Sequence, residues 1–421
     1  MREVFQSLQR LLGSSRGSSS APVSQAWHGI PSHLSDGEAL METTRRRFLG
    51  SAASVVAGAA TPRIVYAAAD PIAAYRTPYK YPELILRATA RKGDFDERSV
   101  DDPIVFRANG RFYMLYIGFD GIGYQTGLAE SEDLVHWNKT ALVGPRNPAS
   151  QYTKYNLAIS SILRDKNLRG SGDAIKVDGR YLAAWNAYPS AGYEEGAAVI
   201  GLATSSDLLH WTLTDPILSP GDGASWEHGG LYRPDLLLDK GKYYLYYNAK
   251  TDALQKSEGG GWHEQTGVAM STDLRRWDRY PGNPILRNGL RGSGTYPASN
   301  PLRNQTPATP DARDSRFASN PFVVRYGSKY AMFYFGYNYQ RPGRACEMLA
   351  LGDDPMHFAK ASEILIDTGA PGTIDETFAH KPSILYHKGV LYHFYCAVSG
   401  KYPNEVRGIA VARSRPWRRD G

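Results

Sequence analysis

Short apolar runs alternate with glycine turns from residue 102 onward, and the first unit shows the pattern in full. An apolar run at 103–106 leads through the turn Asn109-Gly110 into an aromatic-rich segment at 112–116. A further apolar segment at 127–129 is followed by the sequence Ser-Glu-Asp-Leu-Val-His-Trp, which ends at Trp137. Short runs of β-branched and aromatic residues that are separated by such turns predict β-strands joined by hairpins.

The same unit returns four more times along the chain. The later copies begin near Asp173, Arg233, Asn320 and Lys381. A fourth strand follows the third in several units, at 215–218, 284–287 and 363–365. A repeat every sixty to eighty residues or so indicates a closed array of supersecondary units. We therefore predict an all-β fold, a five-bladed β-propeller of four-stranded antiparallel blades, over residues 70–421.

The two ends of this region suggest how the array closes. The fifth unit has no fourth strand after Trp417, whereas residues 83–87, ahead of the first unit, have the pattern of the missing strand. We expect this segment to complete the last blade, which leaves no open sheet edge. The repeated Trp residues are then expected to pack between blades.

The N-terminal region has a different composition. Residues 1–40 are rich in Ser and Gly without apolar periodicity, and we interpret them as a disordered extension or as sequence before a true start at Met41. Residues 41–69 contain three consecutive arginines at 45–47, a short apolar run and an Ala-Ala-Ala site, and they resemble a twin-arginine signal peptide. We therefore expect an exported protein that is periplasmic or secreted. In an oxidising compartment, Cys346 and Cys396 are either bridged or two buried free thiols.

Charge changes this interpretation little. The net charge is +7, of which residues 1–69 contribute +3 through seven Arg and four acids, which leaves +4 on the remainder. The remaining basic residues are scattered, whereas a nucleic-acid-binding protein is expected to gather them on one face. We expect a monomer that binds carbohydrate, with no nucleic-acid partner and no membrane contact after the signal is removed.

The candidate chemistry lies where the innermost strands begin, at the mouth of the central channel. The residue before the Pro at these places is Asp102, Arg233, Asn320 or Lys381, and in the second unit Asp173 stands before Ala174. We expect two acids, two cations and an amide to converge on one polar opening.

The five repeats, the Asp-Pro opening and the Ser-x-Asp-Leu-x-x-Trp turns resemble the five-bladed propeller glycosidases: glycoside hydrolase family 43 and the related arabinanases, xylosidases and fructofuranosidases. The resemblance implies that Asp102 is the general base or the nucleophile. It implies that Asp173 orients the acid and raises its pKa. Those families place a Glu two residues before the third-blade Pro, where this sequence has Tyr232.

The proton donor must therefore come from elsewhere. Glu227, on the loop entering the third blade, and Glu376, entering the fifth, are the nearest carboxylates, and Glu227 is favoured because it lies closest to the family position. His380 is a third option because imidazole titrates near neutral pH. One acid and one further carboxylate are what glycoside hydrolysis requires.

The remaining polar residues of the mouth are candidates for substrate binding. Arg233, Asn320 and Lys381 either pair with the acids or bind a hydroxyl-rich substrate, and Asp235 more plausibly braces its strand. Trp226, Trp262 and Tyr232 are candidate platforms for sugar stacking, with ordinary packing as the alternative. No cofactor is expected, although His380 offers one ligand for a central Ca²⁺ ion.

These observations predict an exported glycoside hydrolase that cleaves polysaccharide-derived oligosaccharides by carboxylate acid/base catalysis. Two alternatives remain open. The propeller could bind glycans without cleaving them, having lost the third carboxylate. It could also be related to glycoside phosphorylases, with Arg233 and Lys381 holding phosphate.

Overall fold

This computed structural model describes residues 70–251, 262–290, 312–338, 344–401 and 404–417. The predicted extension at 1–40 and signal peptide at 41–69 lie outside the described residues. All described strands belong to one unit of the chain, which includes Ile72–Gly421. None of the described helices is both long and apolar enough to cross a bilayer.

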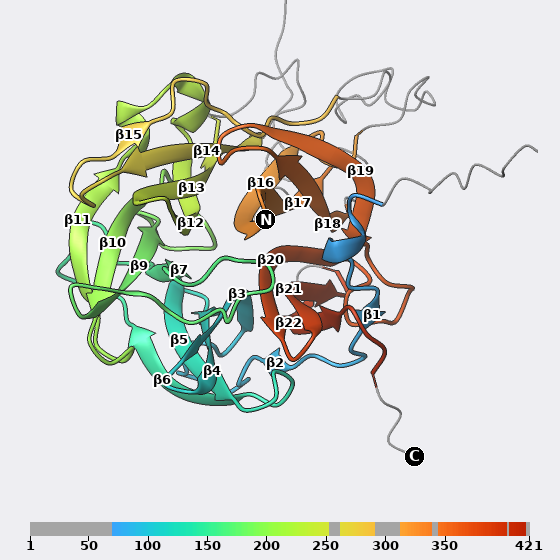
Figure 1. The fold of residues 1–421 in the computed structure, drawn as a ribbon. Coiled ribbons are helices and arrows are strands. Elements are labelled where there is room, and N and C mark those ends of the chain that lie inside the picture. Colours follow the sequence, from blue (N-terminus) through green and yellow to red (C-terminus); the bar gives the residue numbers. More distant parts are fainter. Residues whose placement is uncertain (1–69, 252–261, 291–311, 339–343, 402–403, 418–421) are drawn as a thin grey trace, which may run out of the picture. The chain divides into compact units, whose positions relative to one another are not determined.

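Five groups of antiparallel strands stand around a common centre (Figure 1), and we call them blades one to five in chain order. Blade one contains β3 (Ser99–Ala108), β4 (Arg111–Phe119), β5 (Tyr124–Ser131) and β6 (Asn138–Gly144). Blade two contains β7 (Ala158–Ile162), β9 (Arg180–Ala187), β10 (Val199–Ser205) and β11 (Thr212–Leu218), with the short β8 (Lys176–Val177) beside β9. Blade one therefore has the four antiparallel strands that the sequence predicts.

The later blades follow the same order from the centre outward. Blade three contains β12 (Gly230–Asp239), β13 (Lys242–Lys250), β14 (Glu264–Ser271) and β15 (Asp278–Arg279). Blade four contains β16 (Phe317–Tyr326), β17 (Lys329–Tyr337), β18 (Ala345–Gly352) and β19 (Phe358–Ile366). Blade five contains β20 (Phe378–His387), β21 (Val390–Ser399) and β22 (Val406–Arg413). Three short 3₁₀-helices are described, η1 (Ala73–Tyr75), η2 (Pro220–Asp222) and η3 (Ser225–Glu227).

The fifth blade is completed from the other end of the described chain. β1 (Tyr79–Lys80) and β2 (Leu86–Arg87) both pair with β22, in the register Tyr79 with Arg413 and Leu86 with Ile409. The prediction that residues 83–87 supply the missing outer strand is confirmed. Both ends of the repeat are thereby tied into one sheet, so β22 has a partner on its outer side.

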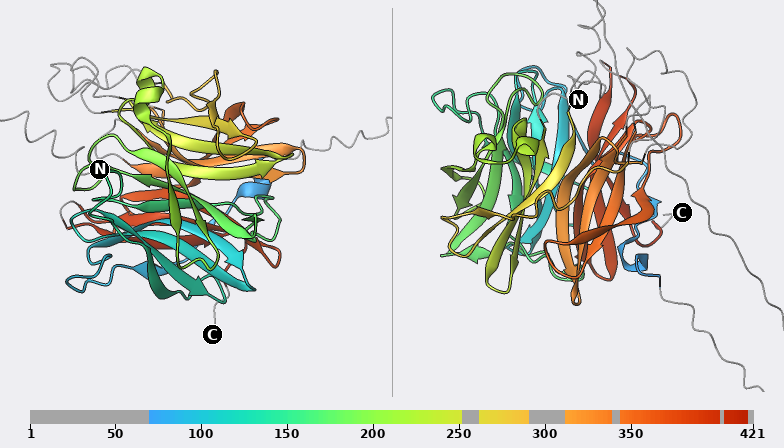
Figure 2. Two further views of the ribbon diagram at one scale, coloured as in Figure 1. Left: turned by 90° about the vertical axis from the view of Figure 1, so that its left-hand side faces the viewer. Right: turned by 90° about the horizontal axis from the view of Figure 1, so that it is seen from above.

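The core consists of apolar layers between neighbouring blades. Phe106 and Trp185 pack between blades one and two, and Val105 and Phe394 pack between blades one and five. Alternate residues of each strand face opposite neighbours, because successive side chains of a strand point to opposite faces of the sheet. Two side views show these twisted sheets packed face against face (Figure 2).

The innermost strands carry a β-bulge that prepares the channel mouth. In β3 the pairing with β4 skips the two residues between Asp101 and Ile104, which are Asp102 and Pro103. The same skip occurs at the X-Pro pairs of β12, β16 and β20. A bulge re-aims the side chain at that point, and Pro is tolerated there because no ladder hydrogen bond is required of it.

Blade two differs from the sequence-based expectation. Its innermost strand is β7, which pairs with β9 and has its bulge between Ile159 and Ser161. The prediction that Asp173 begins this strand is wrong, because Asp173 lies on the segment that leads from β7 to β8. Ser160 takes the position that the other blades give to the residue before Pro.

Both cysteines are free and buried, which agrees with the second of the two alternatives for them. Cys346 lies on β18 and Cys396 on β21.

Candidate active site

The four residues before Pro converge on one pocket, as the sequence predicts. Asp102, Arg233, Asn320 and Lys381 all line it, each 3–6% exposed. Each also has a positive φ, between 48° and 68°. Non-glycine residues rarely adopt this conformation, and such strain persists where the surrounding structure demands it and is concentrated at functional sites.

The pocket has a volume of ≈ 300 Å³, which includes solvent in its open mouth. All five blades contribute to its walls. Beyond the four residues named above, its walls include Ile117, Tyr124, Ala158, Ser160, Asn186, Tyr188, Glu194 and Tyr232. A concave site with a few convergent charged groups is the usual form of an active site.

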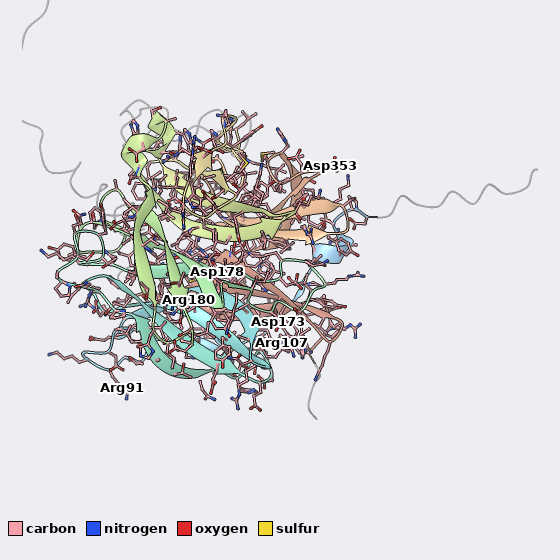
Figure 3. The ribbon with its side chains drawn as sticks, turned by 60° about the vertical axis from the view of Figure 1, so that its left-hand side comes forward. Arg91, Arg107, Asp173, Asp178, Arg180 and Asp353 are labelled. Atoms are coloured by element: carbon pink, nitrogen blue, oxygen red, sulfur yellow. The ribbon has the colours of Figure 1, made fainter. Side chains whose placement is uncertain are left out.

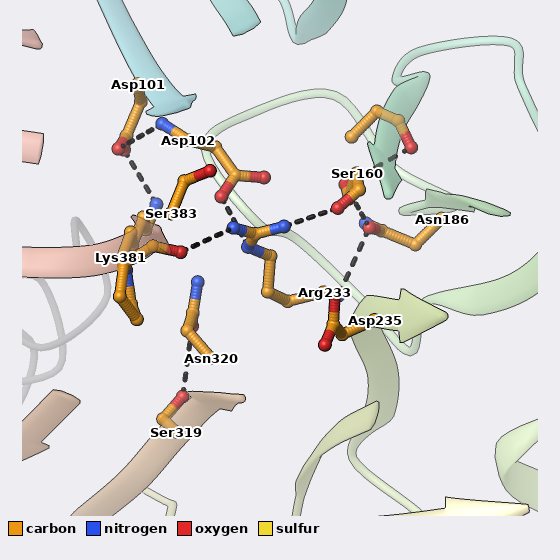
Figure 4. Close-up of polar contacts among 12 residues, drawn as sticks. Asp101, Asp102, Ser160, Asn186, Arg233, Asp235, Ser319, Asn320, Lys381 and Ser383 are labelled. Carbon is orange, nitrogen blue, oxygen red and sulfur yellow. Dashed lines mark hydrogen bonds and ion pairs between the residues drawn. The ribbon is translucent and has the colours of Figure 1, made fainter. Parts of the chain in front are cut away.

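Arg233 lies at the centre of the polar network in Figure 4, and the carboxyl of Asp102 is one of the groups beside it. The Oδ1 atom of Asp102 lies 2.5 Å from Nε of Arg233, without the angle of a good hydrogen bond. Arg233 also donates to the backbone oxygen of Ser160, and its own backbone NH donates to Oδ1 of Asn186 at 3.2 Å. Burial raises the pKa of Asp102 above its usual range, and Asp101 adds to the rise, although Arg233 and Lys381 oppose it. The raised pKa makes Asp102 a better candidate for a proton donor than a carboxyl with an ordinary pKa.

Asp101, beside it, has the opposite character. Its Oδ2 atom lies 2.7 Å from Nζ of Lys381 and 3.0 Å from Nη1 of Arg407, and it accepts a hydrogen bond of 2.8 Å from the hydroxyl of Tyr193. Burial alone would raise the pKa of Asp101, but Lys381 and Arg407 outweigh burial and hold the pKa well below its ordinary value. Asp101 is thus a fixed anion that joins blades one, two and five.

Glu194 is a pocket carboxylate that the sequence analysis missed. It lies on the segment between β9 and β10, with a φ of 70°, and its Oε2 atom lies 3.2 Å from Nζ of Lys250. Burial opposes its ionisation, but positive charges, of which Lys250 acts most strongly and Lys381 also contributes, lower the pKa of Glu194 below its ordinary value. Sequence offered one cue, the adjacent pair Glu194-Glu195 in a glycine-flanked loop, but nothing in it places that loop at the mouth.

Glu227, the favoured acid, lies elsewhere. It is buried on η3, where it accepts 2.7 Å hydrogen bonds from the Tyr247 hydroxyl and from Nε of Arg279 on β15. β15 is the outermost strand of blade three, and Glu227 is absent from the pocket lining. The expectation that Glu227 hangs over the mouth is therefore wrong, because its carboxylate is turned into its own blade.

The two other candidate acids are also held away from the pocket. Glu376 accepts backbone hydrogen bonds from Gly372 at 2.6 Å and Gly400 at 2.8 Å, which lower its pKa and fix a loop. His380 is fully buried behind Lys381, and burial lowers its pKa to about 3. A neutral, enclosed imidazole and a carboxylate kept ionised are both poor proton donors.

Asp173 does not meet Asp102. Its side chain is 51% exposed and lies 3.8 Å from Nε of Arg107, beside which it is labelled in Figure 3. Arg107 is five residues beyond Asp102 on β3, which corresponds to about 16 Å along a strand. Asp173 thus lies toward the other end of the channel, which contradicts its predicted place beside the acid.

The other predicted binding residues divide between pocket and core. Asp235 braces its strand, as the sequence suggested, because it pairs with Lys166 at 2.5 Å and accepts the NH of Val323 at 2.8 Å. Tyr232 lines the pocket. Trp226 stacks on Tyr247 with the ring centres 6.1 Å apart and is absent from the lining.

A central Ca²⁺ ion, for which the sequence offered His380 as one ligand, finds no support in the donor set around that residue. Asp101, His380 and Cys396 place ligand atoms within 4.8 Å of one another. Calcium prefers several oxygen ligands, whereas this set has one carboxylate. That carboxylate is already neutralised by Lys381 and Arg407, so these residues do not fit the ion.

Comparisons with known proteins agree with this architecture. A solved structure named as a complex of BT0996 with RGII superposes with a TM-score of 0.65 and 27% identity, covering 83% of this protein and 95% of the other. A second, named "Glycoside hydrolase", has a TM-score of 0.64 and 26% identity, with coverage of 82% and 94%. The protein shares its fold with glycoside hydrolases. The resemblance predicted from the repeats is confirmed at this level.

Two sequence comparisons match parts of the chain. The model of the glycosyl hydrolases family 32 N-terminal domain matches residues 172–298, which lie in blades two and three and the segment after them. A 1,2-beta-oligomannan phosphorylase from Thermoanaerobacter sp. (strain X514) is 26% identical over 159 residues. That alignment covers 36% of this chain and 43% of the relative, so the chain matches less than half of the relative's length.

Proposed function

We propose that this protein is a glycoside hydrolase in which Asp102 and Glu194 are the catalytic carboxyl groups. The observation that carries the proposal is that the two line one pocket while their pKa values are shifted in opposite directions, up for Asp102 and down for Glu194. Two titratable groups whose environments push their pKa values apart are the mark of an acid and base pair.

The chemistry follows from these protonation states. Protonated Asp102 donates its proton to the glycosidic oxygen as the bond to the anomeric carbon breaks. Anionic Glu194 either removes a proton from the attacking water or attacks the anomeric carbon itself, after which water releases the sugar. This differs from the family resemblance, which implied that Asp102 is the general base or the nucleophile, because Asp102 is here the general acid.

The pocket also offers groups for the sugar hydroxyls. The Tyr188 hydroxyl is buried and has no hydrogen-bond partner among the described residues, and burial raises its pKa well above the ordinary value. It is therefore a neutral hydroxyl with free donor and acceptor capacity. Leaving such a group unsatisfied costs free energy, so a substrate hydroxyl that pairs with it gains affinity.

The pairing of two pocket cations favours hydrolysis over phosphorolysis. Lys381 and Lys250 are already paired with the carboxylates of Asp101 and Glu194 respectively, whereas Arg233 faces the carboxyl of Asp102, which the proposed acid role requires to be protonated. A phosphate would have to compete with those carboxylates, because a cation that is already neutralised attracts a second anion weakly.

The substrate is proposed to be an oligosaccharide derived from RGII, the molecule that is named with the similar structure. We further propose that the protein acts in the periplasm or after secretion, as the segment at 41–69 indicates. Neither statement bears on the choice of acid and base.

Substrates with different leaving groups provide the test. We expect Asp102→Asn to reduce kcat/KM for oligosaccharides by about 10²–10⁴-fold but to retain most activity on dinitrophenyl glycosides, whose leaving group needs no proton. Glu194→Gln should lose activity on both kinds of substrate. The measurement is initial rate across a panel of aryl furanosides and pyranosides, arabinan and fructan oligosaccharides and RGII fragments.

Two outcomes would overturn the proposal. Activity that requires added phosphate would replace hydrolysis by phosphorolysis. Glycan binding without turnover of any substrate by the unmodified protein would make it a binding module, with Tyr232 in place of the family Glu as the natural explanation. Asp353→Asn, a change in an exposed pair with Lys329, is the matched control.

A further inference from the structure

Lys250 is a buried cation that the proposed reaction does not use directly. It is the last residue of β13 and is 5% exposed. Its Nζ atom lies 4.8 Å from the ring centres of Tyr232 and Trp262 and 5.1 Å from that of Tyr188. Three aromatic faces around one ammonium form a cage in which cation–π attraction is strengthened by the exclusion of water.

The open side of this cage faces Glu194. Nζ of Lys250 lies 3.2 Å from its Oε2 atom, and the two residues come from different blades. Glu194 is also within electrostatic range of the ammonium of Lys381 and of four phenols: Tyr124, Tyr188, Tyr193 and Tyr232. Burial raises the pKa of each phenol, so the phenols stay neutral, and Lys250 is the cation that pairs with Glu194.

The cage restrains Lys250 as well as stabilising it. Trp262 donates a 2.7 Å hydrogen bond from Nε1 to Oε1 of Glu264, and its ring stacks on Phe317 with centres 6.1 Å apart. Tyr188 and Tyr232 pack against each other at 5.8 Å. Because the rings are held by other contacts, the ammonium has a defined place, and so does the carboxylate that binds it.

We propose that Lys250 is a positioning residue, whose caged ammonium holds Glu194 in place and in its anionic form at the pocket. The placement stands on the contacts alone, while its catalytic consequence rests on the function proposed above. A lone carboxylate in this buried site would favour the neutral form, because desolvation penalises charge. Lys250, which lowers the pKa of Glu194 more than the other cations do, therefore favours the anion that a base or nucleophile requires.

Chemical rescue tests the proposal directly. Lys250→Ala removes three methylenes and the amine, which together match propylamine. We expect Lys250→Ala to lose at least tenfold in kcat at pH 6 and to move the acidic limb of the pH–rate profile upward by about 1–3 pH units. Propylammonium should restore much of the rate and return the limb toward its original pH, whereas 1-propanol should not. Two further variants separate size from charge: Lys250→Arg keeps both the bulk and the positive charge, and Lys250→Met keeps the bulk alone.

A readout that needs no turnover separates this proposal from the proposed function. Carboxyl carbons of the protein labelled with ¹³C-Glu are titrated by NMR, and Glu194→Gln identifies the resonance. We expect the pKa of Glu194 to rise in Lys250→Ala and Lys250→Met and to fall again with propylammonium. The control is Lys360→Ala, which removes a lysine paired with Asp314 at 2.5 Å in another blade.

The outcomes are distinct. An unchanged Glu194 titration in folded Lys250→Ala and Lys250→Met overturns the positioning role, whatever the enzyme hydrolyses. A shifted titration in a protein that cleaves no glycan upholds the positioning role and removes its catalytic consequence. Rescue by 1-propanol as effective as rescue by propylammonium would show that the side chain fills space, and this too would overturn the proposal.

Discussion

At the scale of single residues, Asp101 and Asp102 show how neighbours in sequence acquire opposite properties. Asp101 faces two cations and the Tyr193 hydroxyl, whereas Asp102 is re-aimed by the bulge toward the pocket and meets Arg233 alone at close range. The Asp-Asp-Pro sequence predicted an acid at the mouth. It did not predict which of the two would be neutralised, because Lys381 and Arg407 are 280 and 306 residues away along the chain.

Replacement of Asp101 by Asn should therefore destabilise the fold strongly. The change leaves two buried cations without their carboxylate, and breaking a buried pair in this way costs about 3–5 kcal/mol. Urea unfolding at pH 7, followed by Trp fluorescence, measures the loss. Asp353→Asn, labelled in Figure 3 and 80% exposed, should change the free energy of unfolding by less than about 0.5 kcal/mol.

The pH dependence of the free energy of unfolding, compared between wild type and Asp101→Asn, provides a second prediction. The pKa of Asp101 is lower in the folded protein than in the unfolded chain, so its stabilisation is complete above the unfolded value, near 4. It is lost as pH falls toward the folded value. The difference in stability between wild type and Asp101→Asn should thus be constant from pH 6 to 8 and shrink in acid. A difference that grew in acid would contradict this assignment.

At the scale of elements, four blades share a clasp that accounts for Glu227. In each, an acid ahead of the innermost strand accepts a hydrogen bond from a Tyr of the second strand and pairs with a Lys or Arg from an outer strand. The sets are Asp96 with Tyr116 and Lys139, Glu227 with Tyr247 and Arg279, Asp314 with Tyr334 and Lys360, and Asp375 with Tyr395 and Lys80. Blade two has Trp185 instead, whose Nε1 donates to the oxygen of Leu202.

Glu227→Gln should accordingly affect stability and spare catalysis. Loss of the charge weakens the bond to Arg279 and leaves the buried side chain of residue 227 and the half-buried guanidinium poorly paired, at a cost of about 1–3 kcal/mol. Thermal unfolding should record that cost, while kcat of the folded variant stays within about threefold of wild type. A loss of two orders of magnitude in kcat at normal stability would instead make Glu227 the proton donor that the sequence analysis favoured.

The bulge also explains which innermost strands could be predicted. Four innermost strands carry an X-Pro pair at the bulge, which can be recognised in the sequence, and all four were placed correctly. β7 has Ser160-Ser161 at the bulge and no Pro, so the sequence does not mark it as an innermost strand. The segment between β7 and β8 contains Gly172-Asp173-Ala174, which has the sequence pattern expected at the start of such a strand. Asp173 was misplaced for that reason.

At the scale of the whole molecule, the site depends on contacts that form only when neighbouring blades pack together. Glu194 reaches the pocket because its loop is anchored from blade one, through the bond from Tyr193 to Asp101 and through the 2.8 Å bond from the Gly192 NH to the oxygen of Ile122. No local pattern in the sequence encodes such contacts between blades. The repeat therefore predicted the scaffold and four wall residues, whereas Glu194, the second carboxylate of the proposed mechanism, could be found only in the assembled fold.

Closure itself should control the stability of the site. Trp417 donates a 2.9 Å hydrogen bond from Nε1 to the oxygen of Tyr79, its ring meets that of Tyr81 at 5.0 Å, and Lys80 pairs with Asp375 at 2.5 Å. Blade five in turn supplies Lys381 and Arg407, which hold Asp101. We expect Trp417→Ala to lower the melting temperature and to raise hydrogen exchange first in β22 and β20, because loss of the tie frees the edge of that blade. Activity should fall at temperatures well below global unfolding, as Asp101 loses its fixed partners.

Trp211→Ala, in a repeated turn of blade two, is the matched control, since it removes a comparable ring whose Nε1 donates a hydrogen bond within its own turn, to the oxygen of Leu208. Equal loosening of blade five in both variants would mean that the terminal tie has no special part in holding the pocket.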